Sequence, residues 1–391
     1  MLSSLAVASL LSIVVAEPVA LTMLDKVHYP HAKCLDGTQA GYYAQEASSE
    51  VDNTKWVIYL NGGGECDSED ACKGATEGAL GSSKYFEETS DASGWYLGSD
   101  YCPKNPDLCS WNHVLDPYCT QDLHTGQVTR SELSDDNWHM YFSGHLVLEA
   151  ILDDLDKRSN SLKNASEILL SGVSAGGLGV WTNVDYIAAR YPLAKVTAAT
   201  VAGFYFFATY YEGENHTDPG GMADFRESAF SDTYELYHAY VDQDCQQAME
   251  ASGRSVGACL VANVSYPFVQ ADSFVAQSQT DSVVLTGHDC WPGDYMYEAP
   301  EVEFMTEWYM NMTAALAPLM QTDEASIDGS TPRSGVFAAA CYTHGGFTST
   351  YPLINDMNMY TAFGNFYFNR TGPEGYKLSD DCGVMCNPTC Q

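Results

Sequence analysis

A serine set between glycines is the feature of this sequence that most directly suggests chemistry. Residues 172–176 read Gly-Val-Ser-Ala-Gly and match the pattern G-x-S-x-G, with Ser174 at the centre. In this pattern the serine can act as a nucleophile that attacks the carbonyl carbon of an ester. The same residues could instead form a glycine turn in which the Ser174 hydroxyl only caps the following helix.

The predicted elements around Ser174 favour the catalytic interpretation. Residues 166–170 are predicted as a strand, and residues 177–191 repeat apolar side chains at helical intervals until Pro192. A serine between a strand and a helix has the position of a nucleophile elbow. The start of the helix would also favour a developing negative charge beside the reacting oxygen.

A glycine loop earlier in the chain could provide the oxyanion hole that such a serine needs. Residues 55–60 (KWVIYL) are predicted as a buried strand, and the sequence Asn-Gly-Gly-Gly follows at 61–64. Glycines allow a loop to turn its backbone amides toward a substrate, although they would equally suit a plain turn. The amide of Ala175, directly after Ser174, would complete the hole.

The order of predicted elements indicates an α/β fold with a mostly parallel sheet flanked by helices. Strands and helices alternate along the chain, as they do when helices cover both faces of a parallel sheet. A helix is expected over 143–159 and another after Ser174. The predicted strands are 55–60, 166–170, 195–204 and 281–287.

The charge of the chain excludes several classes of partner. Of 391 residues, 52 are acidic and only 17 are basic, which gives a formal net charge of −35. A field of this sign repels nucleic acids and anionic membrane surfaces. We therefore expect no nucleic-acid partner and no membrane insertion, and we expect a monomer.

The first residues resemble a secretion signal. An apolar run from Leu5 to Val15 precedes the small residue Ala16, and it is shorter than the roughly 20 residues that a membrane helix needs. We expect a signal peptide over 1–16, with Ala20 as the alternative cleavage position. One domain over 17–391 and an extracellular or cell-wall location would follow.

Cysteine usage agrees with secretion. The chain has thirteen cysteines, so at most six disulfides can form and one thiol is left over. The spacing of Cys382, Cys386 and Cys390 fits no usual zinc site, and we expect disulfides there. Sequons for N-glycosylation occur at Asn164, Asn215, Asn263, Asn311 and Asn369.

Several segments together resemble the pectin acetylesterase and Notum family of carboxylesterases. They are YLNGGGECDSEDAC, WNHVLDPYCTQDLHTG, LLSGVSAGGLG, VAGFYF, CYTHGG and DCGVMCNPTC, in order from about residue 28 to the C-terminus. The resemblance implies an α/β-hydrolase-like fold, Ser-Asp-His catalysis, and neither cofactor nor metal. It also implies a disulfide between Cys66 and Cys72.

The resemblance assigns a role to each candidate residue. Ser174 would be the nucleophile, His344 the general base, and Asp272 in the segment ADSFVAQ the acid that orients the histidine. The oxyanion amides would belong to Gly63, Gly64 and Ala175.

Reasoning from the residues leaves the choice of acid open. The order Ser174, Asp272, His344 is the α/β-hydrolase order. However, Ala271 and Phe274 replace a tyrosine and a tryptophan of the family segment, so its register is uncertain. Three other aspartates also precede the histidine: Asp281, Asp289 and Asp294.

The sequence favours a carbohydrate O-acetyl ester, such as acetylated pectin, as substrate. Aromatic residues over 202–211 could stack on sugar rings or could belong to the core. The net charge disfavours polygalacturonate at low salt, and Glu65 replaces a tryptophan of the family's glycine loop. Two alternatives are a Notum-like esterase acting on lipid acyl groups and a secreted binding protein without catalysis.

Overall fold

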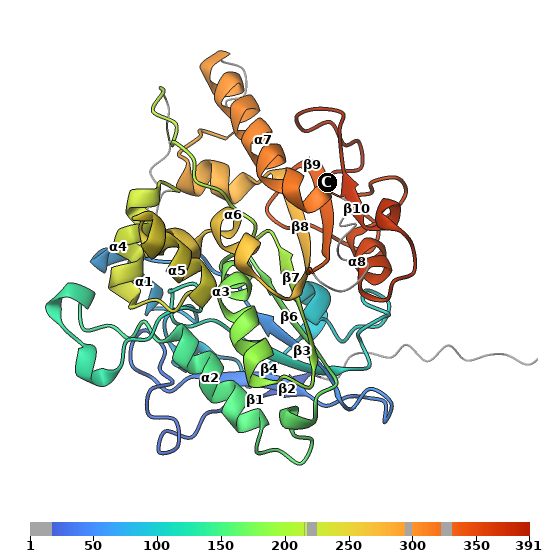
Figure 1. Cartoon of the computed structure of the whole chain (residues 1–391). Coiled ribbons are helices and arrows are strands. Elements are labelled where there is room, and N and C mark those ends of the chain that lie inside the picture. Colours follow the sequence, from blue (N-terminus) through green and yellow to red (C-terminus); the bar gives the residue numbers. More distant parts are fainter. Residues whose placement is uncertain (1–17, 215, 217–224, 294–298, 322–330) are drawn as a thin grey trace, which may run out of the picture.

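The computed structural model describes residues 18–214, 216, 225–293, 299–321 and 331–391, and a ten-stranded sheet forms its centre (Figure 1). The expected signal peptide over 1–16 lies outside the described residues. The strands are β1 Val19–Met23, β2 Gly41–Gln45, β3 Lys55–Leu60, β4 Thr89–Ser90, β5 Asn112–Asp116, β6 Glu167–Val173, β7 Lys195–Val201, β8 Asp272–Thr280, β9 Ser334–Tyr342 and β10 Lys377–Ser379. The helices are α1 Glu69–Ala75, α2 Gly144–Leu155, α3 Ala175–Arg190, α4 Glu227–Tyr237, α5 Gln243–Ser252, α6 Ala262–Ser265, α7 Ala299–Met320 and α8 Met359–Tyr367.

The sheet is mostly parallel. Its strand order is β10-β9-β8-β7-β6-β3-β5-β2-β1-β4, and neighbours run parallel from β10 to β5. Strands β2, β1 and β4 extend the sheet in antiparallel pairing. The predicted α/β fold is confirmed, and the arrangement is that of an α/β-hydrolase-like fold.

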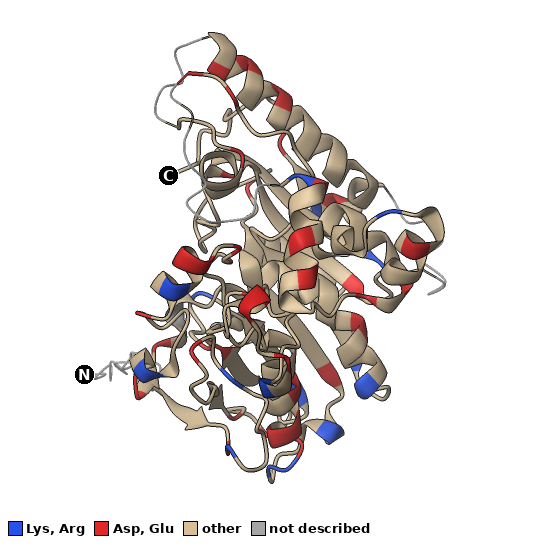
Figure 2. Cartoon of the chain, turned by 90° about the vertical axis from the view of Figure 1, so that its left-hand side faces the viewer, with Lys and Arg blue, Asp and Glu red and all other residues tan. Residues whose placement is uncertain are grey.

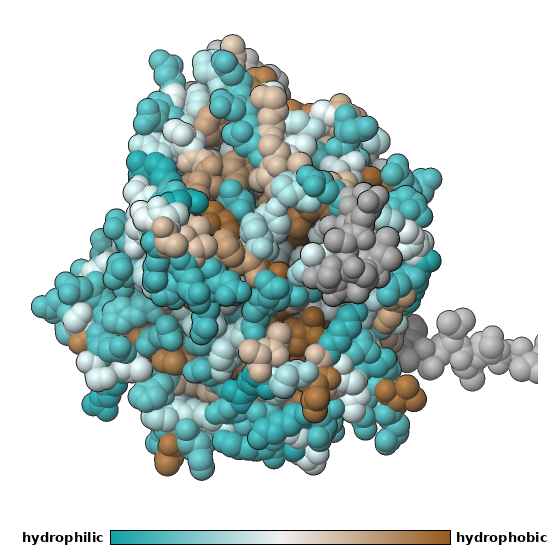
Figure 3. All heavy atoms as spheres, in the orientation of Figure 1, coloured by the Kyte–Doolittle hydropathy of each residue, from teal (hydrophilic) through white to brown (hydrophobic). Residues whose placement is uncertain are grey.

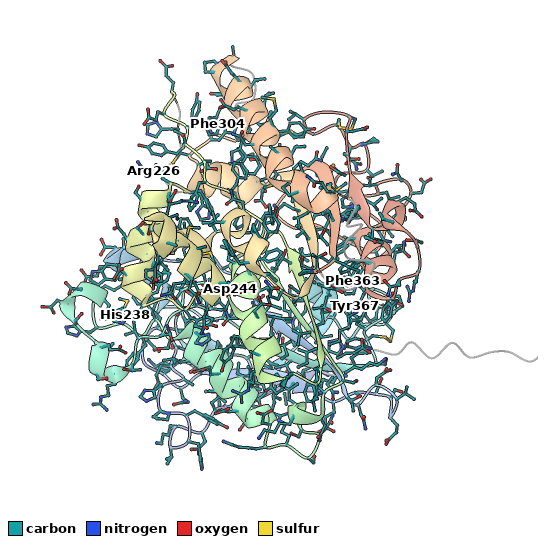
Figure 4. All side chains as sticks on the ribbon, viewed as in Figure 1. Arg226, His238, Asp244, Phe304, Phe363 and Tyr367 are labelled. Atoms are coloured by element: carbon teal, nitrogen blue, oxygen red, sulfur yellow. A yellow bond between two sulfur atoms is a disulfide. The ribbon has the colours of Figure 1, made fainter. Side chains whose placement is uncertain are left out.

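Successive residues of the central strands enter two different cores. In β6, Ile168 and Leu170 belong to the cluster that includes Val180 and Val184 of α3, whereas Leu169 belongs to the cluster under α8. This alternation follows from the two-residue period of a strand. Phe363 and Tyr367 lie on α8 beside the sheet (Figure 4), and the Phe363 ring meets the Phe274 ring edge-on at 5.5 Å.

Three of the four predicted strands are confirmed as β3, β6 and β7, and the helix after Ser174 is α3. The fourth prediction is wrong. Residues 281–287 do not form a strand, because Asp281 accepts hydrogen bonds from the amides of Val283 and Val284 and turns the chain into a π-helical turn, Val284–His288. The strand is the preceding segment, β8.

Twelve of the thirteen cysteines form six disulfides, and Cys290 is buried and belongs to none of them. The pairs are Cys34–Cys119, Cys66–Cys72, Cys102–Cys109, Cys245–Cys259, Cys341–Cys390 and Cys382–Cys386. The disulfide that the resemblance implied beside the glycine loop is therefore present. The C-terminal trio is also disulfide-bonded, and one of its bonds ties β9 to the end of the chain.

Acidic side chains are spread over helices and loops on the side of the molecule that Figure 2 presents, and basic ones are fewer. This agrees with the net charge of −35. Among the helices of the described residues, none is both long and apolar enough to cross a membrane.

Candidate active site

Ser174 occupies a sharp turn between β6 and α3. Its backbone has φ 56° and ψ −127°, a conformation that costs energy for any residue with a side chain. Three hydrogen bonds hold the turn: the Ser174 amide donates to the Val201 carbonyl at 3.0 Å, and the amides of Gly177 and Leu178 donate to the Ser174 carbonyl at 2.8 Å and 3.2 Å. The predicted position between strand and helix is thus the observed one, and the geometry is that of a nucleophile elbow.

The glycine loop after β3 lies directly against this turn. A Cβ atom added to Gly62 would stand 2.8 Å from the Ser174 Cβ and 2.5 Å from the Val173 carbonyl oxygen. Gly64 has φ 73°, which favours glycine, and Gly63 has φ 156°. The structure therefore brings the glycine loop and Ser174 together.

The carbonyls of the glycine loop are held from one side. His124 Nε2 lies 2.9 Å from the Asn61 carbonyl oxygen. The Gln121 side-chain amide donates to the Gly63 carbonyl at 3.1 Å, and the Tyr118 hydroxyl donates to the Gly64 carbonyl at 2.8 Å. With its carbonyls engaged, the loop leaves the amides of Gly63 and Gly64 without a hydrogen bond to any described residue. These amides can serve an oxyanion, as can the Ala175 amide in the first turn of α3, which has no partner within the helix.

Residues 118–124 hold the glycine loop in place, and no pattern in the sequence predicts this role. His124 is buried and stacks on Tyr118 with ring centroids 4.4 Å apart, and its Nδ1 lies 3.3 Å from Asp116 Oδ2. Burial lowers the pKa of His124, but Asp116, the Asn61 carbonyl and Asp122 together raise it by more, so the net pKa lies above the ordinary value. The imidazolium can then donate to the Asn61 carbonyl and pair with the Asp116 carboxylate. Tyr118 and His124 both have left-handed backbones, which no hydrophobic pattern indicates.

His344 follows β9 and is oriented by Asp281. Its Nδ1 lies 2.8 Å and 3.0 Å from the two carboxylate oxygens of Asp281, which is fully buried. The carboxylate of Asp281 in turn accepts a hydrogen bond from the side-chain amide of Gln277 at 3.0 Å. It also accepts the backbone amides of Val283 and Val284 in the following turn. With Nδ1 facing a carboxylate, Nε2 of the neutral ring is the basic atom.

Tyr205 lies near both Ser174 and Asp281. Its buried hydroxyl donates to the Ala202 carbonyl. Burial raises the pKa of Tyr205, and so do the nearby carboxylates of Asp281 and Glu65. The nearby Ser174 hydroxyl lowers the pKa of Tyr205, as a hydrogen-bond donor does. Ser174 and the carboxylate that orients His344 therefore approach the same tyrosine.

The structure contradicts Asp272 as the partner of His344. Asp272 is the first residue of β8, roughly 26 Å of strand away from Thr280 at its other end. Its carboxylate binds the Arg333 side chain at 2.9 Å and 3.2 Å and the Arg333 amide at 2.9 Å. Because the strands are parallel, Asp272 lies at the edge of the sheet opposite Ser174.

The remaining aspartate candidates are accounted for differently. Asp289 is buried and accepts a hydrogen bond from the Trp308 indole at 2.7 Å. Asp294 lies outside the described residues. Asp281 is the aspartate that the structure places on His344.

Comparison with known proteins identifies the family of this chain. Residues 14–391 match the family model described as Pectinacetylesterase. The chain belongs to the pectinacetylesterase family. It is 27% identical to Pectin acetylesterase 5 of Arabidopsis thaliana, over 92% of this chain and 82% of that protein. It is also 27% identical to palmitoleoyl-protein carboxylesterase notum1a of Danio rerio, over 91% of this chain and 70% of that protein. Like these relatives, the chain is a carboxylic ester hydrolase.

Glu65 departs from the tryptophan that the resemblance leads us to expect in the glycine loop of this family. Its side chain is buried, and Oε1 lies 3.5 Å from Nδ1 of His288, which is buried against the Phe225 ring. The carboxyl group of Glu65 is therefore buried beside a histidine inside the protein.

The close packing of the elbow gives a testable prediction for this member of the pectinacetylesterase family. A Cβ at Gly176 would lie 2.0 Å from the Leu60 carbonyl oxygen, so Gly176→Ala must push β3 and α3 apart. We expect a loss of about 1–3 kcal/mol in the free energy of unfolding and a large loss of activity. Gly74→Ala in α1 is the matched control, since a Cβ there meets nothing within 4 Å, and it should stabilise the protein by about 0.5–1 kcal/mol. Urea unfolding measures both, and equal midpoints for the two variants would contradict the prediction.

Proposed function

We propose that the chain is a secreted serine esterase that removes O-acetyl groups from an extracellular polysaccharide such as pectin. The observation that carries the proposal is the His344–Asp281 pair, with Nδ1 2.8 Å from the carboxylate, at the edge of the sheet where the Ser174 elbow meets the glycine loop. The names of the plant relatives support acetyl esters as substrate. No cofactor takes part in this reaction.

In the proposed mechanism His344 acts first as general base and then as general acid. His344 Nε2 takes the proton of Ser174 as Oγ attacks the ester carbonyl, and Asp281 stabilises the resulting imidazolium. The oxyanion is bound by the amides of Gly63, Gly64 and Ala175, each donor contributing about 3 kcal/mol. The bond between the acetyl carbon and the sugar oxygen then breaks, and His344 gives the proton to that oxygen, so the sugar leaves with a free hydroxyl. Water attacks the acetyl-serine by the same route and releases acetate.

The secreted location rests on the six disulfides, which persist in oxidising compartments. Cleavage at Ala16 would leave β1 intact, whereas cleavage at Ala20 would remove two residues that pair with β4. Three sequon residues are exposed: Asn164, Asn311 and Asn369. Asn263 is half-buried, Asn215 lies outside the described residues, and Asn311 lines a groove beside α7, so Asn164 and Asn369 are the better glycosylation candidates.

The test is a panel of p-nitrophenyl acetate, butyrate and palmitate, together with acetate release from acetylated pectin, using Ser174→Ala as the blank. Preference for acetate and release from pectin would support the proposal. Preference for palmitate would favour lipid-acyl removal, the second candidate, which the Notum relatives suggest. No turnover above the blank by folded protein would leave a binding protein.

The pH dependence of kcat/KM is a further prediction. Burial lowers the pKa of His344, but the charge and hydrogen bond of Asp281 raise it by more, so the net pKa is above 6.5. Because only the neutral ring accepts the serine proton, activity should fall as the pH drops through this raised pKa. The midpoint of the acid limb should lie above pH 6.5. A midpoint below 6.5 would contradict the pairing with Asp281.

A further inference from the structure

A groove of about 440 Å³ lies between the chain that leaves β7 and helix α7. Half of its lining residues are aromatic: Phe207, Tyr210 and Tyr211 on one side and Phe304 and Trp308 on the other. The charged residues of the lining, all of them described, are two glutamates, Glu212 and Glu307. This combination of aromatic faces and carboxylates is not needed for the esterase reaction itself.

The wall of the groove is fixed by Asp289. Its carbonyl accepts the Tyr211 amide at 2.7 Å, and its carboxylate accepts the Trp308 indole at 2.7 Å. The Tyr211 and Phe304 rings meet edge-on at 5.4 Å. The aromatic surface is therefore preformed, and a ligand would not have to order it.

The groove is open to solvent. Phe207, Tyr210 and Phe304 are half-exposed, and both glutamates are exposed. Figure 4 shows Phe304 on α7 above Arg226, and Figure 3 shows apolar side chains reaching the surface in the same region. Arg226 covers the Tyr210 ring at 4.6 Å but does not belong to the lining.

The groove begins close to the nucleophile. A Cβ atom added to Gly203 would lie 3.3 Å from the Ser174 carbonyl oxygen, and Phe207 follows Gly203 by four residues. Four residues of extended chain span at most about 14 Å. A polymer with one acetylated unit at Ser174 can therefore place another of its units in the groove.

We propose that this groove binds an uncharged sugar unit of the polysaccharide substrate, and this inference rests on the proposed function. Aromatic rings bury the apolar C–H face of a pyranose, while Glu212 and Glu307 accept hydrogen bonds from its hydroxyls. The same carboxylates repel the carboxylate of a uronic acid unit at low salt. The groove thus selects neutral regions of an acetylated polysaccharide.

The test uses Ser174→Ala protein, which cannot turn over its ligand, and titration calorimetry with a neutral galactose or xylose tetrasaccharide and with tetragalacturonate. We expect the neutral ligand to bind and Phe304→Ala in the same background to weaken it by about tenfold. Met310→Ala is the matched control, because Met310 is 55% exposed on the same helix and lies outside the groove lining. It should leave the affinity unchanged.

Glu307→Gln keeps the shape of an exposed side chain and serves as the second variant, because it carries little risk to folding. It should strengthen tetragalacturonate binding by about fivefold at low salt, with the gain fading as salt is added.

Three results would overturn the inference: no binding of the neutral ligand, tetragalacturonate binding as tightly as the neutral ligand, or decanoate competing for the groove in its place. Ester hydrolysis by the wild type is measured separately. Hydrolysis without sugar binding would refute the groove alone, and sugar binding without hydrolysis would refute the esterase alone.

Discussion

Asp281→Asn should hydrolyse p-nitrophenyl acetate with a kcat/KM about 10⁴-fold below that of the wild type, because a neutral amide at this position no longer selects the right tautomer of the base. The carboxylate of Asp281 is fully buried and contacts His344 Nδ1 with both oxygens. An asparagine could still accept the amides of Val283 and Val284, so the turn should persist. Circular dichroism and the unfolding midpoint would check this.

Asp272→Asn is the matched control. It makes the same chemical change at the start of β8, whereas Asp281 directly follows the end of that strand, and an asparagine oxygen can still accept from Arg333. We expect kcat/KM within about twofold of the wild type and a modest loss of stability. A large loss of activity in this variant, with Asp281→Asn active, would restore the sequence-based assignment.

The residual activity of Asp281→Asn should also have a shifted pH profile. The Asp281 charge is what raises the pKa of His344 against the effect of burial. Without that charge, burial dominates and the pKa falls, so the acid limb of kcat/KM should move to lower pH. An unchanged acid limb would mean that another group titrates there.

The regular parts of this fold could be predicted from sequence because their residues carry periodic signals. KWVIYL became β3 at the predicted bounds, and the helical repeat after Ser174 became α3, ending just before Pro192. The elbow and the glycine loop could be paired in advance, because parallel strands end at the same edge of a sheet. These signals placed Ser174 and the loop with Gly63 and Gly64.

The acid could not be chosen because β8 does not look like a buried strand. Its last four residues, 277–280, are polar and fully buried. Gln277 accepts the Phe204 amide at 3.0 Å, and Gln279 donates to the Asp380 carbonyl at 2.9 Å. Hydrogen-bond partners so distant in sequence leave no local pattern, so the sequence predicts the strand over 281–287 instead of 272–280. In that prediction Asp281 begins a strand, whereas in the structure it directly follows one.

The residues that hold the glycine loop could not be found either. Their segment contains left-handed backbones at Tyr118, Gln121, Leu123 and His124. Such a chain path has no periodicity, and its function lies in hydrogen bonds to Asn61, Gly63 and Gly64 some sixty residues away. Only the resemblance to the family pointed to this region, without assigning a role.

Because Tyr118 holds the glycine loop, we expect Tyr118→Phe to lower kcat strongly. The lost hydroxyl donates to Gly64 O at 2.8 Å and accepts from the Leu123 amide at 2.9 Å, so both groups lose a partner. Gly64 can then rotate its amide away from the oxyanion. We expect kcat for acetate esters to fall by about 10- to 100-fold with little change in KM, since the oxyanion forms only in the transition state.

Tyr42→Phe separates this positioning role from general stability. Tyr42 is equally buried, and its hydroxyl also makes two hydrogen bonds, to Asp154 at 2.6 Å and from Arg158 at 2.7 Å, far from the loop in β2. Both variants should lose about 1–3 kcal/mol in the free energy of unfolding, because each leaves polar partners unsatisfied. Only Tyr118→Phe should lose kcat. If kcat falls equally in the two variants, or in neither, then Tyr118 does not position the oxyanion loop, and its hydrogen bond to Gly64 serves stability alone.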